Sequence, residues 1–412
     1  MAVAPRQPGI RSPRYAFIVC CAGMMSLAIA INLLPVFLTT LQNEFGKPLT
    51  NEQLGRLGMA TFVGLVTAIL AGAPLADRIG AKVFTVLGNA LVAAGLVWMS
   101  FAPSYDSLLL ACLLMGFGAG SLDMVLSPIV AAVQPHRRSA AMNWLHSFYC
   151  IGAVVTVLLA SWALRQNIGW RTLSLGLAAM PLVVLVAFAV MYIPPLVADG
   201  ADATTGRHRL RELLRVGYFW AALVAIFLGG ATEVGMAYWL PAYSEQGLGF
   251  SKWTSGLALT GFSIAMAVGR IAVGMMGTRV DGVRTMLFCC STSVLFILIA
   301  CFAPWPSVAL SACILAGLAG SALWPTMLGV AADRFPRGGA SMFGLLAASG
   351  NLGGIVMPWI VGFTTDQGTT HWTHATAMRL GLSTAALCPL FMGLILLRLR
   401  RCVSVNPVIT GL

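Results

Sequence analysis

The sequence predicts an all-α membrane protein whose twelve transmembrane helices form two six-helix parallel pseudo-repeats. Three observations lead to this prediction: a shortage of charged residues, twelve separate apolar stretches, and a fixed offset that relates the two halves. Hydrophobic residues make up 58% of the 412 residues and charged residues only 9%, with a mean hydropathy of +0.87. Because soluble domains carry about 25% charged residues, most of this chain is expected to face lipid.

The chain is basic, with a formal net charge of +12. Its lysines and arginines lie in short gaps between apolar stretches, which is typical of a membrane protein and argues against a nucleic-acid partner. The cysteines lie almost entirely inside apolar stretches and form no CxxC pair, so they are interpreted as packing residues. The N-terminal segment MAVAPRQPGIRSPR shows no convincing cleavage site and is expected to be a cytoplasmic tail.

A helix needs roughly 20 apolar residues to cross a bilayer. Twelve such stretches are expected, at 15–39, 54–76, 83–103, 107–133, 140–163, 172–194, 218–243, 253–276, 285–303, 307–332, 340–363 and 375–397. The expected organisation is a tail at 1–14, a six-helix bundle at 15–194, a charged linker at 195–217, a second bundle at 218–397 and a tail at 398–412.

The distribution of positive charge predicts the orientation of the chain. When the N-terminus is placed inside and each span reverses the side, most of the 25 lysines and arginines fall in inside segments. The positive-inside rule therefore predicts that both termini and the linker are cytoplasmic. The expected location is the inner (plasma) membrane, with the chain passing through it many times.

The two halves of the sequence echo each other. Phe101-Ala102-Pro103 recurs as Phe302-Ala303-Pro304, an offset of 302 − 101 = 201 residues. Because each half has an even number of spans, both halves enter the membrane from the same side, and a site is expected between them. The same offset of 201 relates further pairs: Gly55 and Gly256, Arg78 and Arg279, Cys112 and Cys313, Gly116 and Gly317, Gly152 and Gly353.

The loop after the second span carries a family signature. LADRIGAK, residues 75–82, is similar to the G-x-L-A-D-R-x-G-R-K signature of the major facilitator superfamily, with Ala73 in place of the leading glycine. With its six-plus-six arrangement, the chain resembles this superfamily of secondary transporters. The resemblance implies a gating loop; the alternative is a solvated loop whose charges only set the orientation. The matching residues are Asp77, Arg78, Gly80 and Lys82.

Asp123 lies about halfway along the fourth expected span. An ionised carboxylate at that depth costs at least roughly 2.5 kcal/mol, so it is expected to face a partner or a water-filled cavity. Two readings stay open: a structural hydrogen bond, to a serine or to His146, or a group that loads and releases a proton. Gly116, Gly118 and Gly120 would let a neighbouring helix approach closely.

The surrounding pattern, G-x-G-x-L-D-x-x-x-S-P at 118–128, resembles the fucose-permease-like branch of the superfamily, whose acid here belongs to the proton and sugar pathway. A second acid, Glu233, lies in the seventh span ahead of Trp239, which also resembles this branch. The offset pairs Glu233 with Asn32 of the first span, and Trp324 of the tenth span with Asp123. The resemblance implies that these spans line a central cavity.

Asp123 and Glu233 are therefore the expected proton-coupling residues. Unlike sugar porters with a further acid in the first span, this chain has Asn32 there, which leaves two alternatives: coupling rests on Asp123 and Glu233, or the substrate differs from theirs. Substrate contacts are expected from Asn32, Trp239 and Trp324, although an interfacial aromatic belt is an equal alternative for Trp239.

Three further polar residues share one face of the fifth span at helical spacing: Asn143, His146 and Tyr149. They are candidates for binding substrate hydroxyls or, equally, for interhelical hydrogen bonds. Arg270 in the eighth span is expected to extend its side chain to the cytoplasmic surface.

Taken together, the sequence predicts a secondary active transporter that moves a small polar solute, a sugar, with protons by alternating access. One alternative is proton-driven efflux of amphipathic compounds, which the 20 methionines would suit. Another is a membrane-embedded enzyme or a non-transporting sensor. The sequence has no GxxxxGK[ST] loop, and the pair His371 and His374 lacks a third ligand. An enzyme, a cofactor or a metal is therefore not expected; the expected partners are substrate, proton and lipid bilayer, with the chain a monomer.

Overall fold

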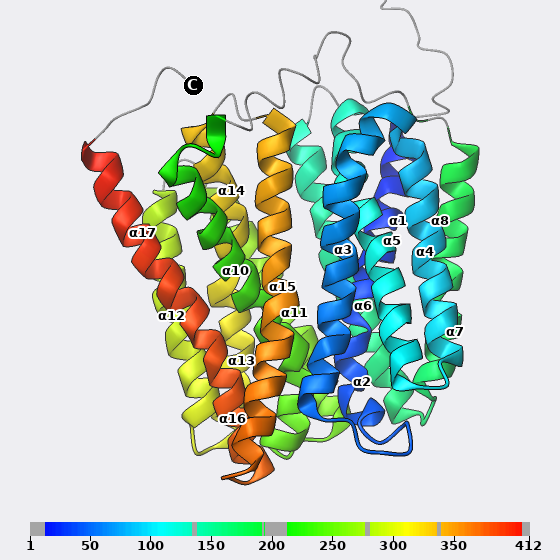
Figure 1. Cartoon of the computed structure of the whole chain (residues 1–412), viewed down its shortest axis with the longest axis vertical. Helices are drawn as coiled ribbons and strands as arrows, with labels where there is room; N and C mark the ends of the chain where they lie inside the picture. Colours follow the sequence, from blue (N-terminus) through cyan, green and yellow to red (C-terminus); the bar gives the residue numbers. More distant parts are fainter. Residues whose placement is uncertain are drawn as a thin grey trace, which may run out of the picture.

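The computed structural model describes residues 13–133, 138–191, 193, 212–276, 281–335 and 339–405. Within these ranges it contains 12 helical segments that are long and apolar enough to cross a membrane. The expected all-α fold of twelve spans is confirmed. Most of the expected linker 195–217 lies outside the described residues. Helix α1 begins and helix α17 ends at the same face, here called the terminal face, and the opposite face is called the distal face (Figure 1).

The first half forms one side of the molecule in Figure 1. Its helices are α1 (Pro13–Asn32), α2 (Leu34–Leu41), α3 (Asn51–Ile79), α4 (Ala81–Phe101), α5 (Tyr105–Val133), α6 (Arg138–Arg165), α7 (Trp170–Leu177) and α8 (Ala179–Val190). The pairs α1 with α2 and α7 with α8 each make up one span.

The second half forms the other side, with α15 and α11 next to the first half (Figure 1). Its helices are α10 (Gly217–Ala242), α11 (Lys252–Met276), α12 (Gly282–Phe302), α13 (Pro306–Gly320), α14 (Leu323–Arg334), α15 (Gly339–Thr369), α16 (His374–Ser383) and α17 (Leu387–Val405). A π-helical turn at Tyr243–Gly247 continues α10, and a 3₁₀ turn at Thr384–Ala386 joins α16 to α17.

Glycines set the packing distance around α5, as the sequence predicts. A Cβ at Gly116 would clash with the carbonyl of Thr61, and one at Gly120 with the carbonyl of Leu65, both on α3. On the other side, a Cβ at Gly118 would meet the backbone of α4. The three glycines therefore let α5 lie directly against two helices, because any side chain there would force the backbones apart.

Two of the broken spans are those of α1 with α2 and of α13 with α14, and in each a proline follows the break. Pro35 is the second residue of α2 and follows the break after Asn32, while Pro325 is the third residue of α14. Proline has no N–H to donate to the carbonyl four residues earlier. The carbonyl of Ser321 therefore has no partner from residue 325 and is available to another donor in the middle of the membrane.

The two halves are bonded to each other at the distal face. Thr39 donates to Glu245 at 2.6 Å, and Lys252 donates to Thr40 at 3.1 Å. Deeper in the same region, the Tyr238 hydroxyl donates to the carbonyl of Leu54 at 2.7 Å. These contacts describe a conformation that is closed at the distal face.

Candidate functional site

An ion pair joins two helices of the second half. Glu233 on α10 accepts a hydrogen bond from Arg270 on α11, with 2.6 Å between Oε2 and the guanidinium nitrogen. The two side chains are 18% and 28% exposed, so they are largely removed from solvent. The expectation that Arg270 extends to the cytoplasmic surface is wrong, because its charge is satisfied inside the protein.

Arg270 is held at a second point by the broken span. Its Nε lies 3.3 Å from the carbonyl oxygen of Ser321, the carbonyl that Pro325 leaves free. A guanidinium presents its donors in a rigid planar fork, so two separate acceptors fix its orientation. The break between α13 and α14 thus positions the cation of the site.

The first half contributes a polar group from α1 and α6. Asn32 is the last residue of α1, and its amide nitrogen lies 2.9 Å from the carbonyl of Ala28 and 3.3 Å from the hydroxyl of Tyr149. Two of the residues predicted to bind substrate are therefore in contact. Discontinuous helices commonly place polar backbone and side chains at the centre of transporters.

The polar groups of the two halves face each other. Tyr149 and the neighbouring Cys150 lie within electrostatic range of both Glu233 and Arg270. His146, one turn earlier on α6, is exposed and within range of Arg270. Packing of α6 against α11 brings these groups together across the interface between the halves. The polar groups of this candidate site therefore come from both halves.

Asp123 lies on α5 and is partly buried. Among the described residues, the structure gives its carboxylate no hydrogen-bond or ion-pair partner. The nearest expected partner, His146, has its Nε2 3.4 Å from the hydroxyl of Ser127 instead. A structural hydrogen bond between Asp123 and His146 is therefore not formed in this conformation.

The two tryptophans lie in different surroundings. Trp239 is buried, and its indole nitrogen donates to the carbonyl of Pro358 on α15 at 3.0 Å, so it does not belong to a lipid-facing aromatic belt. Trp324 is partly buried, and its ring fills the space beside Gly230 and Gly350. Both residues pack between helices in this conformation.

The remaining predicted residues lie near the terminal face or are incompletely described. Gly80 joins α3 to α4 with a φ of 89°, a conformation that favours glycine. Lys82 is partly buried at the start of α4, and Asp77 and Arg78 lie in the last turn of α3. The side chains of Asp77, Arg78 and Asn143 fall outside the part of the structure that can be described.

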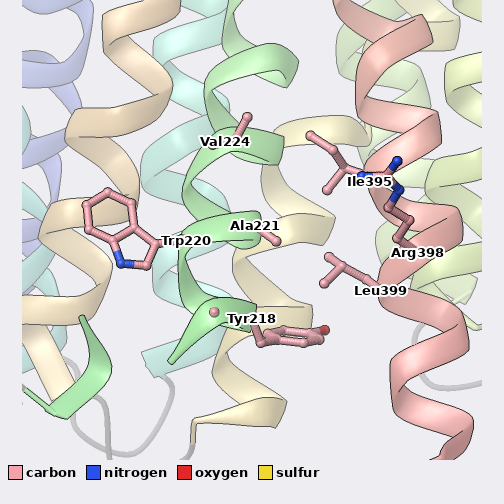
Figure 2. Close-up of a pocket in the computed structure, with 8 residues that line it drawn as sticks. Tyr218, Trp220, Ala221, Val224, Ile395, Arg398 and Leu399 are labelled. Carbon is pink, nitrogen blue, oxygen red and sulfur yellow. The ribbon is translucent and has the colours of Figure 1, made fainter. Parts of the chain in front are cut away.

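A separate groove of about 440 Å³ lies between the first turns of α10 and the end of α17. Figure 2 shows Tyr218 and Ala221 of α10 on the side toward α17, which contributes Ile395, Arg398 and Leu399, whereas the ring of Trp220 points away from α17. All of its lining residues belong to the second half and lie near the terminal face. The groove is therefore distinct from the central polar site.

Sequence reasoning identified Glu233 but missed its partner. The available signal was the presence of two opposite charges in adjacent spans, since charges within a membrane usually pair with one another. Pro325 was a second signal, because a proline within a span frees a carbonyl that needs a donor. Ser321 and Cys150 carried no signal that distinguished them from other small residues.

The comparison with known protein families agrees with this arrangement. The profile described as Major Facilitator Superfamily matches residues 18–259 and 246–402. A probable nitrate/nitrite transporter, NarK2 of Mycobacterium tuberculosis, is 27% identical over 327 residues, covering 76% of this chain and 79% of that protein. The nitrite extrusion protein of Bacillus subtilis is 20% identical over 317 residues, covering 74% and 77%.

Solved structures share the fold over nearly the whole chain. A bacterial homolog of the human lysosomal transporter Spinster, in an inward-facing conformation, has a TM-score of 0.79 at 14% identity, covering 98% of this chain and 100% of that one. The D-xylose-proton symporter has a TM-score of 0.77 at 14% identity, covering 92% and 97%. FucP in the outward conformation has a TM-score of 0.63 at 20% identity, covering 91% and 98%. The chain belongs to the major facilitator superfamily and is a multi-pass secondary transporter rather than an enzyme.

Proposed function

We propose that this chain moves a small, neutral, hydroxyl-rich solute such as a sugar together with protons. The observation that carries the proposal is the ion pair between Glu233 and Arg270, which faces Asn32 and Tyr149 of the opposite half. Hydroxyl groups can donate to Glu233 and accept from Arg270, Asn32 or Tyr149. A solute bound between the halves would contact both and would move with the closure of one face and the opening of the other.

The coupling step follows from the charges of the site. When Glu233 is ionised, it neutralises Arg270, and when it is protonated, the guanidinium becomes available to substrate oxygen atoms. Asp123 has no cationic partner among the described residues, so its ionised form is the costlier one at bilayer depth. Protonation of either acid lowers the cost of passing through an occluded state, and this links proton movement to the change of conformation.

The proposed orientation places the terminal face in the cytoplasm of the cell, with the chain in the plasma membrane. It is based on the concentration of lysine and arginine in the terminal-face segments of the sequence. The loop that contains Asp77, Arg78, Gly80 and Lys82 is proposed to act as the gate at this face. In this orientation the conformation described here is closed to the outside.

Transport of nitrate or nitrite is a second candidate function, and Arg270 is the observation that favours it. A guanidinium binds planar oxyanions with two parallel hydrogen bonds. With Glu233 and Asp123 both ionised, however, the three charged groups sum to a net charge of −1. An anion would therefore bind only together with protons, which makes proton–anion symport the form that this site allows.

The test is transport in proteoliposomes with an imposed proton gradient. Uptake of labelled monosaccharides is compared with uptake of nitrate and nitrite, while an internal dye reports proton entry. We expect accumulation of at least one sugar with simultaneous proton entry. Accumulation of nitrate or nitrite but of no sugar would support the second candidate, and accumulation of amphipathic cations alone would contradict both.

Two isosteric variants assign the coupling residues. Asp123→Asn mimics the protonated acid, so it should abolish accumulation driven by protons while retaining exchange of labelled for unlabelled substrate. Glu233→Gln should reduce both, because it also changes the partner of Arg270. Asp106→Asn, an exposed acid in the first turn of α5, serves as the control and should leave both activities unchanged. Proton-driven accumulation by Asp123→Asn would show that Asp123 does not carry the proton.

A further inference from the structure

A carboxylate from the second half completes the first turn of a helix in the first half. Asp366 lies in the last turn of α15, at the distal face. Its Oδ1 accepts hydrogen bonds from the backbone nitrogen of Asn51 at 3.0 Å and from the side-chain nitrogen of Asn51 at 2.8 Å. Its Oδ2 accepts from the backbone nitrogen of Glu52 at 2.6 Å. One side chain thus receives three hydrogen bonds from the other half of the molecule.

The first turn of α3 explains why two backbone donors are free for Asp366. Thr50 and Gln53 form a capping box, in which Thr50 accepts from the backbone of Gln53 at 3.1 Å and Gln53 accepts from the backbone of Thr50 at 3.0 Å. This cap satisfies the donor of residue 53 but not those of Asn51 and Glu52, which have no helical partner. Asp366 bonds to these two donors.

The negative charge of Asp366 is more favourable at the N-terminal end of α3 than at the C-terminal end of its own helix, α15. A carboxylate at the C-terminal end of a helix faces the negative end of that helix dipole, which is unfavourable, whereas the N-terminal end of a helix favours negative charge. When the halves separate at the distal face, Asp366 loses three hydrogen bonds and remains at the negative end of α15. The loss of the hydrogen bonds and the unfavourable helix dipole therefore both oppose separation of the two halves at the distal face.

Neighbouring contacts bring the two helix ends close enough for this arrangement. A Cβ at Gly362 would clash with the carbonyl of Asn51, and one at Gly55 would clash with the carbonyl of Pro358. Trp359 on α15 adds a hydrogen bond to Glu52 at 3.0 Å. The absence of side chains at the two glycines lets α3 and α15 approach, and Asp366 then bonds the first turn of α3.

The pseudo-repeat supplies an internal comparison. The offset of 201 maps Asp366 onto Arg165, Glu52 onto Trp253 and Asn51 onto Lys252. At this second interface Arg165, in the last turn of α6, lies over the ring of Trp253 at 5.3 Å. A cation at the C-terminal end of its own helix is already stabilised there. The repeat thus preserves the place of the contact, but of the two equivalent residues only Asp366 carries a charge that the end of its own helix disfavours.

We propose that Asp366 is the latch of the distal gate, which selects the conformation closed at that face. The proposal rests on the alternating access of a superfamily transporter, but it does not depend on the identity of the substrate. Loss of the latch should therefore shift the protein toward the conformation that is open at the distal face, even without substrate.

The experiment measures the distance between the distal ends of the two halves. Spin labels are placed at Gln166 and Thr370, exposed residues that follow α6 and α15, in a variant without native cysteines. In detergent and without substrate, Asp366→Asn should raise the ratio of the long-distance to the short-distance population about tenfold, the size expected from losing a helix cap. Asn51→Ala, which keeps both backbone donors, should give a smaller shift in the same direction.

Two controls distinguish the proposed latch from the loss of a helix cap and from the loss of an acid at the distal face. Thr50→Ala removes the helix's own cap in the same turn without changing any bond to Asp366, so it should leave the distance distribution unchanged. Asp106→Asn removes an exposed acid in the first turn of α5, and it should also have no effect. An unchanged distribution in Asp366→Asn, or an equal shift in Thr50→Ala, would overturn the proposal. Because the distance measurement requires no transport, its result tests the role of Asp366 independently of the proposed substrate.

Discussion

At the scale of single residues, the candidate site contains one satisfied ion pair and one acid that has no partner among the residues the structure describes. Arg270 is bonded to Glu233 and to the carbonyl of Ser321, whereas no described residue donates to Asp123. The sequence identified both acids because a carboxylate within an apolar stretch is conspicuous. It did not identify the pairing of Glu233 with Arg270. Arg270 lies six residues before the end of α11, and its side chain is long enough to reach either an internal partner or the membrane surface. Only the positions of α10 and α14 decide between the two.

The first prediction concerns the stability of the ion pair. Arg270→Gln leaves the carboxylate of Glu233 without its cation, and this should lower the stability of the protein by about 2 kcal/mol, less than for a fully buried pair. The double variant Arg270→Gln with Glu233→Gln removes both charges and should recover most of the loss without recovering transport. Thermal unfolding in detergent and uptake in proteoliposomes measure the two effects. Equal melting temperatures for the single variant and the unmodified protein would show that the pair contributes nothing to stability.

At the scale of helices, breaks in the spans position the polar groups. The twelve spans were predictable because a stretch of about 20 apolar residues is long enough to cross the bilayer as a helix. The lengths of the helices were less predictable: the stretch expected at 340–363 is part of a helix that continues to Thr369. The added turns contain Asp366, which the sequence placed in a loop. There Asp366 bonds to α3, and no local pattern in the sequence shows this long-range contact.

The second prediction concerns Pro325. Pro325→Ala supplies a backbone N–H to the carbonyl of Ser321, which would then bond within the helix instead of to Arg270. We expect the melting temperature to stay the same or rise, and the uptake rate to fall several-fold, because the guanidinium loses one of its two fixed acceptors. Pro306→Ala, at the start of α13 and exposed, is the matched control and should change neither quantity. Normal uptake by Pro325→Ala would show that the carbonyl of Ser321 does not position Arg270.

At the scale of the whole molecule, two halves of similar topology meet along α3 with α15 and along α6 with α11. The offset of 201 predicted this relation because repeated span boundaries place equivalent residues on equivalent helices. The side chains at the interface have diverged between the repeats, however, as the pairs Asp366 with Asn51 and Arg165 with Trp253 show. A repeat in the backbone therefore predicts where contacts form but not their chemistry.

The third prediction tests the orientation of the molecule. Single cysteines at Thr370, at the distal face, and at Asp333, at the end of α14, are introduced into a variant without native cysteines. A maleimide that cannot cross membranes should label Thr370→Cys in intact cells and Asp333→Cys only after permeabilisation. The opposite pattern would place the terminal face outside and reverse the proposed topology.

The difference between the two interfaces at the distal face also bears on how that face opens. Contact between Arg165 and Trp253 requires no specific hydrogen-bond geometry, so it tolerates rotation of one helix against the other. The three hydrogen bonds to Asp366 are directional and are lost within a short displacement. We therefore expect the α6–α11 side to serve as a hinge while the α3–α15 side swings apart. Solutes would then enter along one edge of the molecule, between α3 and α15, rather than through a funnel centred on the pseudo-two-fold axis.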